Sequence, residues 1–311
     1  MITLARIGLV LGLACAPVPV VAAEDARPDP WKLPTPDLAT LLISLTESKR
    51  EYVIESAAKV PDAARPPERV ESASSEEERK SLQSCRDLQQ AGKWPEAANS
   101  LDVLLKSNPA LHEARALAGL SLLRMGRPKE AAAALRDALI GNRRNPEAWK
   151  ALEEVASALG RKVVRPYLQP QSWLSPGKGD AVQIWFTSGN AGGAKGDGMP
   201  AWACYALARA WYRYEGGYAA DFPGEAYRFT FREVLHGVGA MLQVCRKSRA
   251  DGEELPDDLR RLMAEEDAGT IVPFAFFALY VEPLPAKEIG GFDLLRPRLV
   301  RYFDERILSE K

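Results

Sequence analysis

Three glycines at a constant interval constrain the fold of this chain more than any other feature. Gly92, Gly126 and Gly160 follow one another at intervals of 34 residues. A repeat of this length is typical of stacked helical hairpins. A glycine suits the turn between two antiparallel helices because it readily adopts a positive φ angle. The interval therefore predicts helical hairpins over residues 76–161.

The residues around these glycines support the same interpretation. Glu-Ala follows at 96–97 and again at 130–131, with Leu101 and Leu135 four residues beyond each alanine. A small residue just after the turn lets two helices approach closely, and the leucine fills the space between them. Asn-Pro at 108–109 and at 145–146 separates the units. The sequence thus predicts two full hairpins and the first helix of a third.

This segment resembles the tetratricopeptide repeat family. The resemblance rests on small and large residues at the family's positions, namely Gly119, Gly126, Ala131, Leu135 and Ala138 in the second unit and Trp149 and Leu152 in the third. Cys85, Arg115 and Pro146 depart from the family's pattern. The resemblance implies a repeat solenoid whose first helices face a protein or peptide partner. The implied partner-binding residues are Arg86, Gln89, Gln90, Glu113, Leu120, Arg124, Glu147, Lys150 and Glu154.

Two and a half hairpins are fewer than the three or so units that normally stabilise a solenoid. We therefore expect a cap from elsewhere in the chain. The candidates are an amphipathic helix predicted over residues 37–59 and the region after residue 162.

Residues 1–23 have the pattern of a secretory signal peptide. Arg6 precedes an apolar run from Ile7 to Val21, and the small residues that end at Ala23 suit cleavage there. We expect a soluble periplasmic or secreted protein, since no later segment is long enough to span a bilayer. A lipoprotein tethered at Cys15 is an alternative, because Gly12 to Cys15 partly resembles a lipoprotein processing box.

Residues 24–75 are expected to hold a leader, a helix and a linker. Prolines mark the leader, and Thr35 and Pro36 are placed to open the helix over 37–59. Residues 61–75 read as a Pro/Ser linker. Ser75 and Glu78 then form a capping-box pattern at the start of the first repeat helix.

Residues 163–311 are expected to form a mainly helical C-terminal domain. One short β-prone run at 182–187 leads into a Gly-rich loop at 188–199. Five helical segments follow, at about 200–215, 230–247, 256–267, 273–281 and 297–308. The predicted fold class is all-α: a solenoid of helical hairpins followed by a helical domain with at most a short β element.

The overall charge and the Gly-rich loop exclude several kinds of ligand. With 41 Lys+Arg against 42 Asp+Glu, the chain lacks the basic surplus of a nucleic-acid binder. Lys195 is preceded by Ala and followed by Gly, so the loop does not fit a phosphate-binding Walker motif. We therefore expect no nucleic-acid partner and no cofactor.

Cysteine and histidine are too few for a metal site of the zinc type. His112 and His236 are the only histidines, and no C-x-x-C motif occurs. We expect no metal. In an oxidising compartment Cys204 and Cys245 are the candidate disulfide, and Cys85 is expected to be a buried free thiol.

A dense aromatic segment offers an alternative site. It contains Trp202, Tyr205, Trp211, Tyr212, Tyr214, Tyr218 and Phe222. Core packing is one interpretation, and an aromatic ligand groove is the other. Lys195, Asp197 and Trp202 are the candidate ligand residues of a groove shared with the preceding loop. His236 lies one turn after Glu233, so the two side chains could touch. A partly buried structural histidine is favoured over a catalytic one.

These patterns favour one function and leave two alternatives. The favoured function is an exported scaffold that binds a protein or peptide through its repeats and catalyses no reaction. The first alternative is an envelope-acting hydrolase with its site at residues 188–218. The second is a tethered structural lipoprotein.

Overall fold

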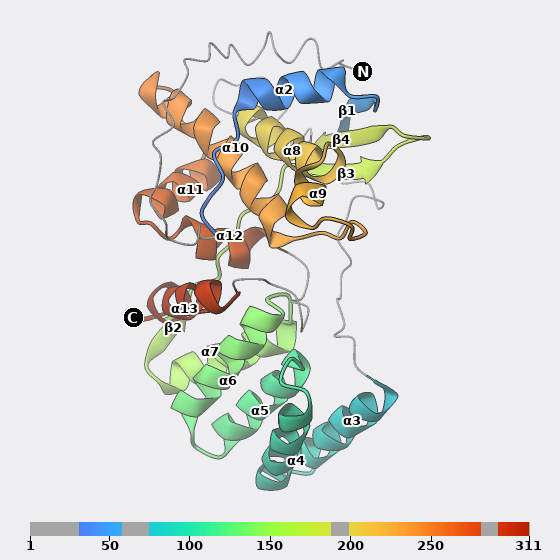
Figure 1. The fold of residues 1–311 in the computed structure, drawn as a ribbon. Coiled ribbons are helices and arrows are strands. Elements are labelled where there is room, and N and C mark those ends of the chain that lie inside the picture. Colours follow the sequence, from blue (N-terminus) through green and yellow to red (C-terminus); the bar gives the residue numbers. More distant parts are fainter. Residues whose placement is uncertain (1–30, 58–74, 188–198, 281–291, 311) are drawn as a thin grey trace, which may run out of the picture. The chain divides into compact units, whose positions relative to one another are not determined.

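The computed structural model describes residues 31–57, 75–187, 199–280 and 292–310 (Figure 1). The predicted signal peptide with Cys15, the linker as far as residue 74, and residues 188–198 of the Gly-rich loop lie outside these ranges. The chain divides into two compact units. One comprises Pro67–Pro166 with Val281–Lys311 and is called the repeat unit here. The other comprises Met1–Pro66 with Tyr167–Tyr280 and is called the mixed unit.

The repeat unit contains the predicted hairpins. Its helices are α3 (Glu76–Gln90), α4 (Trp94–Ser107), α5 (His112–Arg124), α6 (Pro128–Gly141) and α7 (Pro146–Ala158), stacked in Figure 1. Gly92 and Gly126 lie in the turns at φ 72° and 73°, and Gly160 follows α7 at φ 68°. Strand β2 (Arg161–Val163) begins where a second helix of the third unit would stand. The prediction of two and a half hairpins is therefore confirmed.

Small and large residues interlock between the repeat helices as expected. The side chains of Ala97, Leu101, Ala131 and Leu135 are fully buried. Gly119 lies so close to Leu135 that an added Cβ atom would come within 2.6 Å of the leucine Cγ. Only a residue without a side chain allows α5 to approach α6 this closely. The predicted capping box of Ser75 and Glu78 is also present at the start of α3.

The end of the chain caps the repeats. α13 (Phe292–Tyr302) leads through one π-helical turn, η3 (Phe303–Ile307), to strand β5 (Leu308–Glu310), which pairs antiparallel with β2. Leu295, Leu299 and Phe303 are buried. The helix starts five residues before the predicted Pro297, which it accommodates in its interior. This cap comes from the region after residue 162, which was one of the two candidate caps expected from the sequence.

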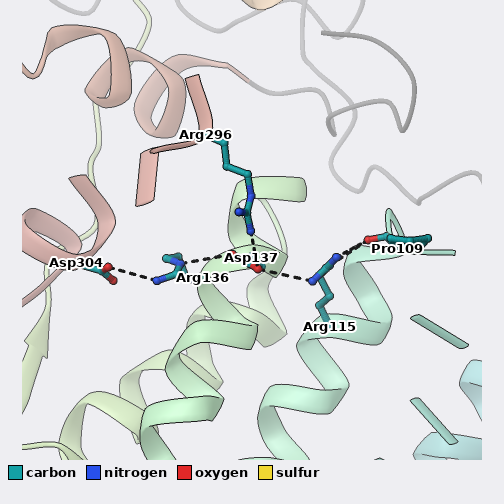
Figure 2. A network of polar contacts seen from close by, with 6 residues as sticks. All are labelled: Pro109, Arg115, Arg136, Asp137, Arg296 and Asp304. Atoms are coloured by element: carbon teal, nitrogen blue, oxygen red, sulfur yellow. Dashed lines mark hydrogen bonds and ion pairs between the residues drawn. The ribbon is translucent and has the colours of Figure 1, made fainter. Parts of the chain in front are cut away.

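An arginine-rich polar network ties this cap to the hairpins. Asp137 on α6 lies 2.9 Å from Arg296 of α13, 3.6 Å from Arg115 of α5 and 3.4 Å from Arg136 (Figure 2). Arg136 in turn lies 3.3 Å from Asp304 of η3. Because residues 292–310 belong to the repeat unit, residues 163–311 are not one domain in the structure.

The mixed unit is built around a three-stranded sheet in the order β1–β4–β3. β1 (Tyr52–Ala57) runs parallel to β4 (Val182–Thr187), and β3 (Ser172–Pro176) runs antiparallel to it. β4 is the predicted β-prone run. The chain remains mainly helical, as the predicted class requires, but the sheet is larger than the single short element expected.

The helix predicted over residues 37–59 is wrong in its second half. α2 covers only Leu38–Glu47, and its N-cap is Asp37, whose carboxylate accepts from the Ala39 amide, rather than Thr35. Tyr52 and Ile54 are buried, pairing with Val182 and Ile184 in the sheet. The consecutive aromatic and β-branched residues at 52–54 suit a strand. The partner strand, β4, is 130 residues away in sequence.

Five helices complete the mixed unit: α8 (Met199–Tyr214), α9 (Gly217–Asp221), α10 (Phe231–Ala250), α11 (Asp257–Asp267) and α12 (Ile271–Leu279). α8 and α10 pack against each other closely because Gly237 faces the Tyr205 ring, where a Cβ atom would come within 2.6 Å. Leu38, Leu41 and Leu45 of α2 belong to the same core as the α8 alanines.

Residues of the predicted leader cross α10 as an extended segment (Figure 1). The Pro34 carbonyl oxygen lies against Gly239, where a Cβ atom would overlap it, and the Gln243 side chain donates to the Pro36 carbonyl oxygen over 2.6 Å. Trp31 is buried and stacks on Phe231. Gly237 and Gly239 thus mark two places where α10 is approached closely, and part of the predicted leader belongs to the core.

Within the described ranges, no helix combines the length and apolar character needed to cross a bilayer.

Candidate functional site

The predicted partner-binding residues lie on the first helix of each repeat. α3 carries Arg86, Gln89 and Gln90; α5 carries Glu113, Leu120 and Arg124; α7 carries Glu147, Lys150 and Glu154. The surface that these residues form is called the first-helix surface below. Successive first helices are neighbours in a stacked solenoid, so one extended ligand can touch several units.

Two of these residues are joined directly. An Arg124 Nη atom lies 2.7 Å from a carboxylate oxygen of Glu154, and the side chains are 44% and 37% exposed. This ion pair links α5 to α7, the first helices of two consecutive units. An exposed pair of this kind adds little stability, at most about 1 kcal/mol. Its charges therefore remain accessible to a partner.

Gln89 is the exception within the predicted set. Its side chain is buried, and its amide nitrogen lies 2.8 Å from both the Leu117 carbonyl oxygen and the Ser121 hydroxyl oxygen. Gln89 therefore joins α3 to α5 and presents no polar atom to a partner. Its assignment as a partner-binding residue is corrected for this reason. Ser121, a polar residue among the apolar residues of α5, was the sequence signal that could have indicated an internal partner.

The remaining predicted residues are available at the surface. Gln90, Glu147 and Lys150 are exposed, while Arg86, Glu113 and Leu120 are partly exposed. The surface therefore carries both charges, an amide and an apolar side chain. This mixture matches the varied side chains of a polypeptide.

Trp202 does not line a groove in the structure. Its side chain is 1% exposed and packs edge-on against Tyr205, with ring centroids 5.5 Å apart. Its carbonyl oxygen accepts a 2.9 Å hydrogen bond from Ser172. The core interpretation is thus correct for Trp202, which is removed from the candidate ligand residues. Lys195 and Asp197 lie outside the described residues.

His236 packs on aromatic rings and forms no hydrogen bond or ion pair with Glu233 in the described chain. Its ring centroid lies 4.8 Å from that of Tyr212 and 5.7 Å from that of Trp211. Burial, and then the charge of Arg232, lower the pKa of His236 to about 4, so the ring is neutral at neutral pH. A neutral imidazole packed on aromatic rings is a structural residue.

Glu233 instead anchors a buried cluster that the sequence analysis missed. Its carboxylate is fully buried, lies 2.8 Å from an Arg209 Nη atom and accepts from the Tyr227 hydroxyl over 2.5 Å. Burial, together with the Glu233 charge, raises the pKa of Tyr227, which keeps the hydroxyl protonated as a donor. The backbone amide of Glu233 receives the predicted cap from Thr230. The T-x-x-E pattern showed the helix start but not the distant arginine.

The three cysteines of the described chain are buried free thiols. Cys85 agrees with its prediction. Cys204 and Cys245 lie on the adjacent helices α8 and α10, but the expected disulfide is not formed in the structure. Burial, and then the nearby Cys245, raise the pKa of Cys204 to about 12, and burial with Asp258 and Glu266 raises that of Cys245 to about 12. Such thiols are protonated and unreactive at neutral pH.

The described residues contain no cluster of three or more His, Cys, Asp or Glu side chains arranged to hold a metal ion.

Comparison with known families agrees with the geometry of the hairpins. The tetratricopeptide repeat model matches residues 84–146 and 116–161. No curated protein and no solved structure matches the chain. Residues 84–161 are therefore tetratricopeptide repeats, a module that generally mediates protein–protein interaction.

Proposed function

We propose that this protein is an exported scaffold that binds a protein or peptide partner along its first-helix surface and catalyses no reaction. The observation that carries the proposal is the Arg124–Glu154 ion pair, which joins two consecutive first helices at the surface. A peptide lying across α5 and α7 would meet both charges, then Lys150 one helical turn from Glu154 and Glu147 two turns from it.

The cap supports the same role. Because α13, η3 and β5 cover the last hairpins, the solenoid needs no further repeat to bury its apolar faces. A short, capped array offers a small and defined surface, which suits one linear segment of a partner.

The export part of the proposal rests on residues 1–23. Cleavage after Ala23 would give a mature chain beginning at Glu24 without Cys15. Intact-mass measurement of the protein recovered from its native compartment tests this point. A chain that begins at Cys15 and carries acyl groups would contradict the soluble form and support the tethered one.

Charge reversal tests the binding surface. The double variant Arg124→Glu/Lys150→Glu should lose the partner recovered by the wild-type protein from an envelope extract. The matched control is Lys106→Glu/Lys129→Glu, which reverses two exposed charges on the second helices α4 and α6. Recovery of the same partner by both variants would contradict the proposed surface.

A second control separates recognition from stability. The exchange variant Arg124→Glu/Glu154→Arg keeps an ion pair between α5 and α7 but reverses its direction. If the partner binds Arg124 and Glu154 through their charges, the exchange variant should bind it more weakly although its thermal midpoint is unchanged. Wild-type binding by the exchange variant would show that the ion pair is only structural.

A further inference from the structure

One arginine of the mixed unit is surrounded by aromatic rings but has no acid. The Cζ atom of Arg213, near the end of α8, lies 4.9 Å from the ring centroid of Tyr214 and 4.3 Å from that of Tyr227. Within the described chain Arg213 forms no hydrogen bond or ion pair, and its Nε atom is buried without an acceptor. Aromatic faces attract a cation but do not neutralise its charge.

Arg209, one helical turn earlier, has the carboxylate partner that Arg213 lacks. Its Cζ atom also lies over two rings, 5.3 Å from Tyr205 and 5.2 Å from Phe229. Unlike Arg213, it has a carboxylate, since Glu233 lies 2.8 Å away. The two arginines therefore occupy similar aromatic surroundings, and of the two only Arg213 lacks a carboxylate partner in the described chain.

A second cation lies close to the same ring. The Cζ atom of Arg50 is 5.3 Å from the Tyr214 centroid. Its carboxylate neighbour, Asp180, is 3.8 Å away with a side chain 90% exposed, which makes that pair weak. Both Arg50 and Arg213 therefore contribute positive potential beside Tyr214.

Glu215, the next acidic residue after Arg213 in the sequence, already has hydrogen-bond partners. The Glu215 carboxylate accepts hydrogen bonds from the hydroxyls of Ser48 and Tyr52. It therefore holds the chain before β1 against the end of α8, and it forms neither a hydrogen bond nor an ion pair with Arg213. The positive charge of Arg213 is left without a partner from the described protein.

We propose that Arg213, assisted by Arg50, binds the oxyanion group of a small ligand, either a phosphate or a carboxylate. The tyrosine rings contact the planar guanidinium and Nε is enclosed, so the terminal Nη atoms are the donors left for a ligand. Their fixed geometry suits two oxygens of one oxyanion, which a guanidinium binds through parallel hydrogen bonds.

The test uses the full mature chain and two probes, inorganic phosphate and acetate. Thermal midpoints are measured at increasing probe concentration, with sodium chloride keeping the ionic strength constant, because binding to the folded state raises the midpoint. We expect one or both probes to raise it above the chloride control. A response to phosphate alone or to acetate alone identifies which oxyanion the site takes. No response to either would overturn the proposal.

Variants locate the site. Arg213→Gln should weaken the binding of the responding probe about tenfold or more, as expected for loss of a charge-assisted pair of hydrogen bonds. Arg50→Gln, at a more exposed side chain, should weaken it several-fold and serves as the test if the first variant does not fold. Arg249→Gln, an exposed arginine of α10, should bind as the wild type does. Wild-type affinity in either Arg213→Gln or Arg50→Gln would contradict the assignment.

Discussion

The Gln89 side-chain amide donates to the Ser121 hydroxyl oxygen over 2.8 Å and joins α3, the first helix of the first repeat, to α5, the first helix of the second. Replacing Gln89 by Leu removes this bond and its companion to Leu117. We expect a loss of about 1–2 kcal/mol in the free energy of unfolding, because the buried partners lose their donor. Denaturant titration followed by circular dichroism measures it.

The neighbouring residue provides the matched control for this change. Gln90 is exposed on the same helix, so Gln90→Leu should alter the free energy of unfolding by no more than about 0.5 kcal/mol. Equal effects of the two substitutions would show that the buried amide has no special role.

Asp137 is expected to hold the C-terminal cap on the repeats. Asp137→Asn removes the charge shared by Arg115, Arg136 and Arg296 (Figure 2). The amide hydrogens of α13 should then exchange faster, by a factor of about 5 to 10, since partly buried ion pairs contribute on the order of 1 kcal/mol. Hydrogen exchange with mass-spectrometric readout of this helix provides the measurement.

A mutation on the same helix shows whether the effect is specific. Arg301 pairs only locally with Glu305, and its side chain is 79% exposed. Arg301→Gln should leave the exchange rates of α13 unchanged. Unchanged rates in Asp137→Asn would mean that apolar contacts such as those of Leu295 hold the cap alone.

The buried pair of Arg209 and Glu233 should be among the most sensitive positions of the mixed unit. Glu233→Gln leaves a buried arginine without its charge partner, and such losses typically cost about 3–5 kcal/mol. Tyr227→Phe removes a single hydrogen bond to the same carboxylate and should cost about 1 kcal/mol. Thermal unfolding of both variants checks this order, and a smaller loss for Glu233→Gln than for Tyr227→Phe would contradict it.

His236 makes stability depend on pH in acid. Its pKa is lowered from the ordinary 6.5 to about 4 in the folded state, so the unfolded chain binds the proton more readily between these values. The stabilisation is complete above pH 6.5 and is lost as the pH falls toward 4. A difference of this size corresponds to roughly 3 kcal/mol.

The variant His236→Gln isolates that contribution. Between pH 6.5 and pH 4 the wild-type protein should lose more stability than this variant does. His112 and the carboxylates remain in both proteins, so their titration cancels in the comparison. Parallel pH profiles for the two proteins would show that His236 does not titrate as described.

Local signals in the sequence predicted the repeat unit well. The 34-residue interval is directly visible as a repeat, and the alanines after each turn and the cap at Ser75 act within a short stretch of sequence. The buried role of Gln89 was not visible, because it depends on Ser121 of the next hairpin.

The mixed unit was predicted less well because its decisive contacts are distant in sequence. Strand β1 pairs with β4 across 130 residues, and its short run of Tyr, Val and Ile also fits one face of a helix. Likewise, the charge of Arg209 is matched by Glu233, and the charge of Arg213 by no acid in the described chain. No spacing rule distinguishes these two arginines.

Site-specific photo-crosslinking shows whether a partner binds at the first-helix surface. A photoreactive amino acid is placed at Lys150 or Gln90 on the first-helix surface, and in control proteins at Lys106 or Lys129 on the second helices. We expect one protein partner to be crosslinked in the native compartment from Lys150 and Gln90, and not from Lys106 or Lys129. Crosslinks to that partner only from the control positions, or from none of the four, would contradict it.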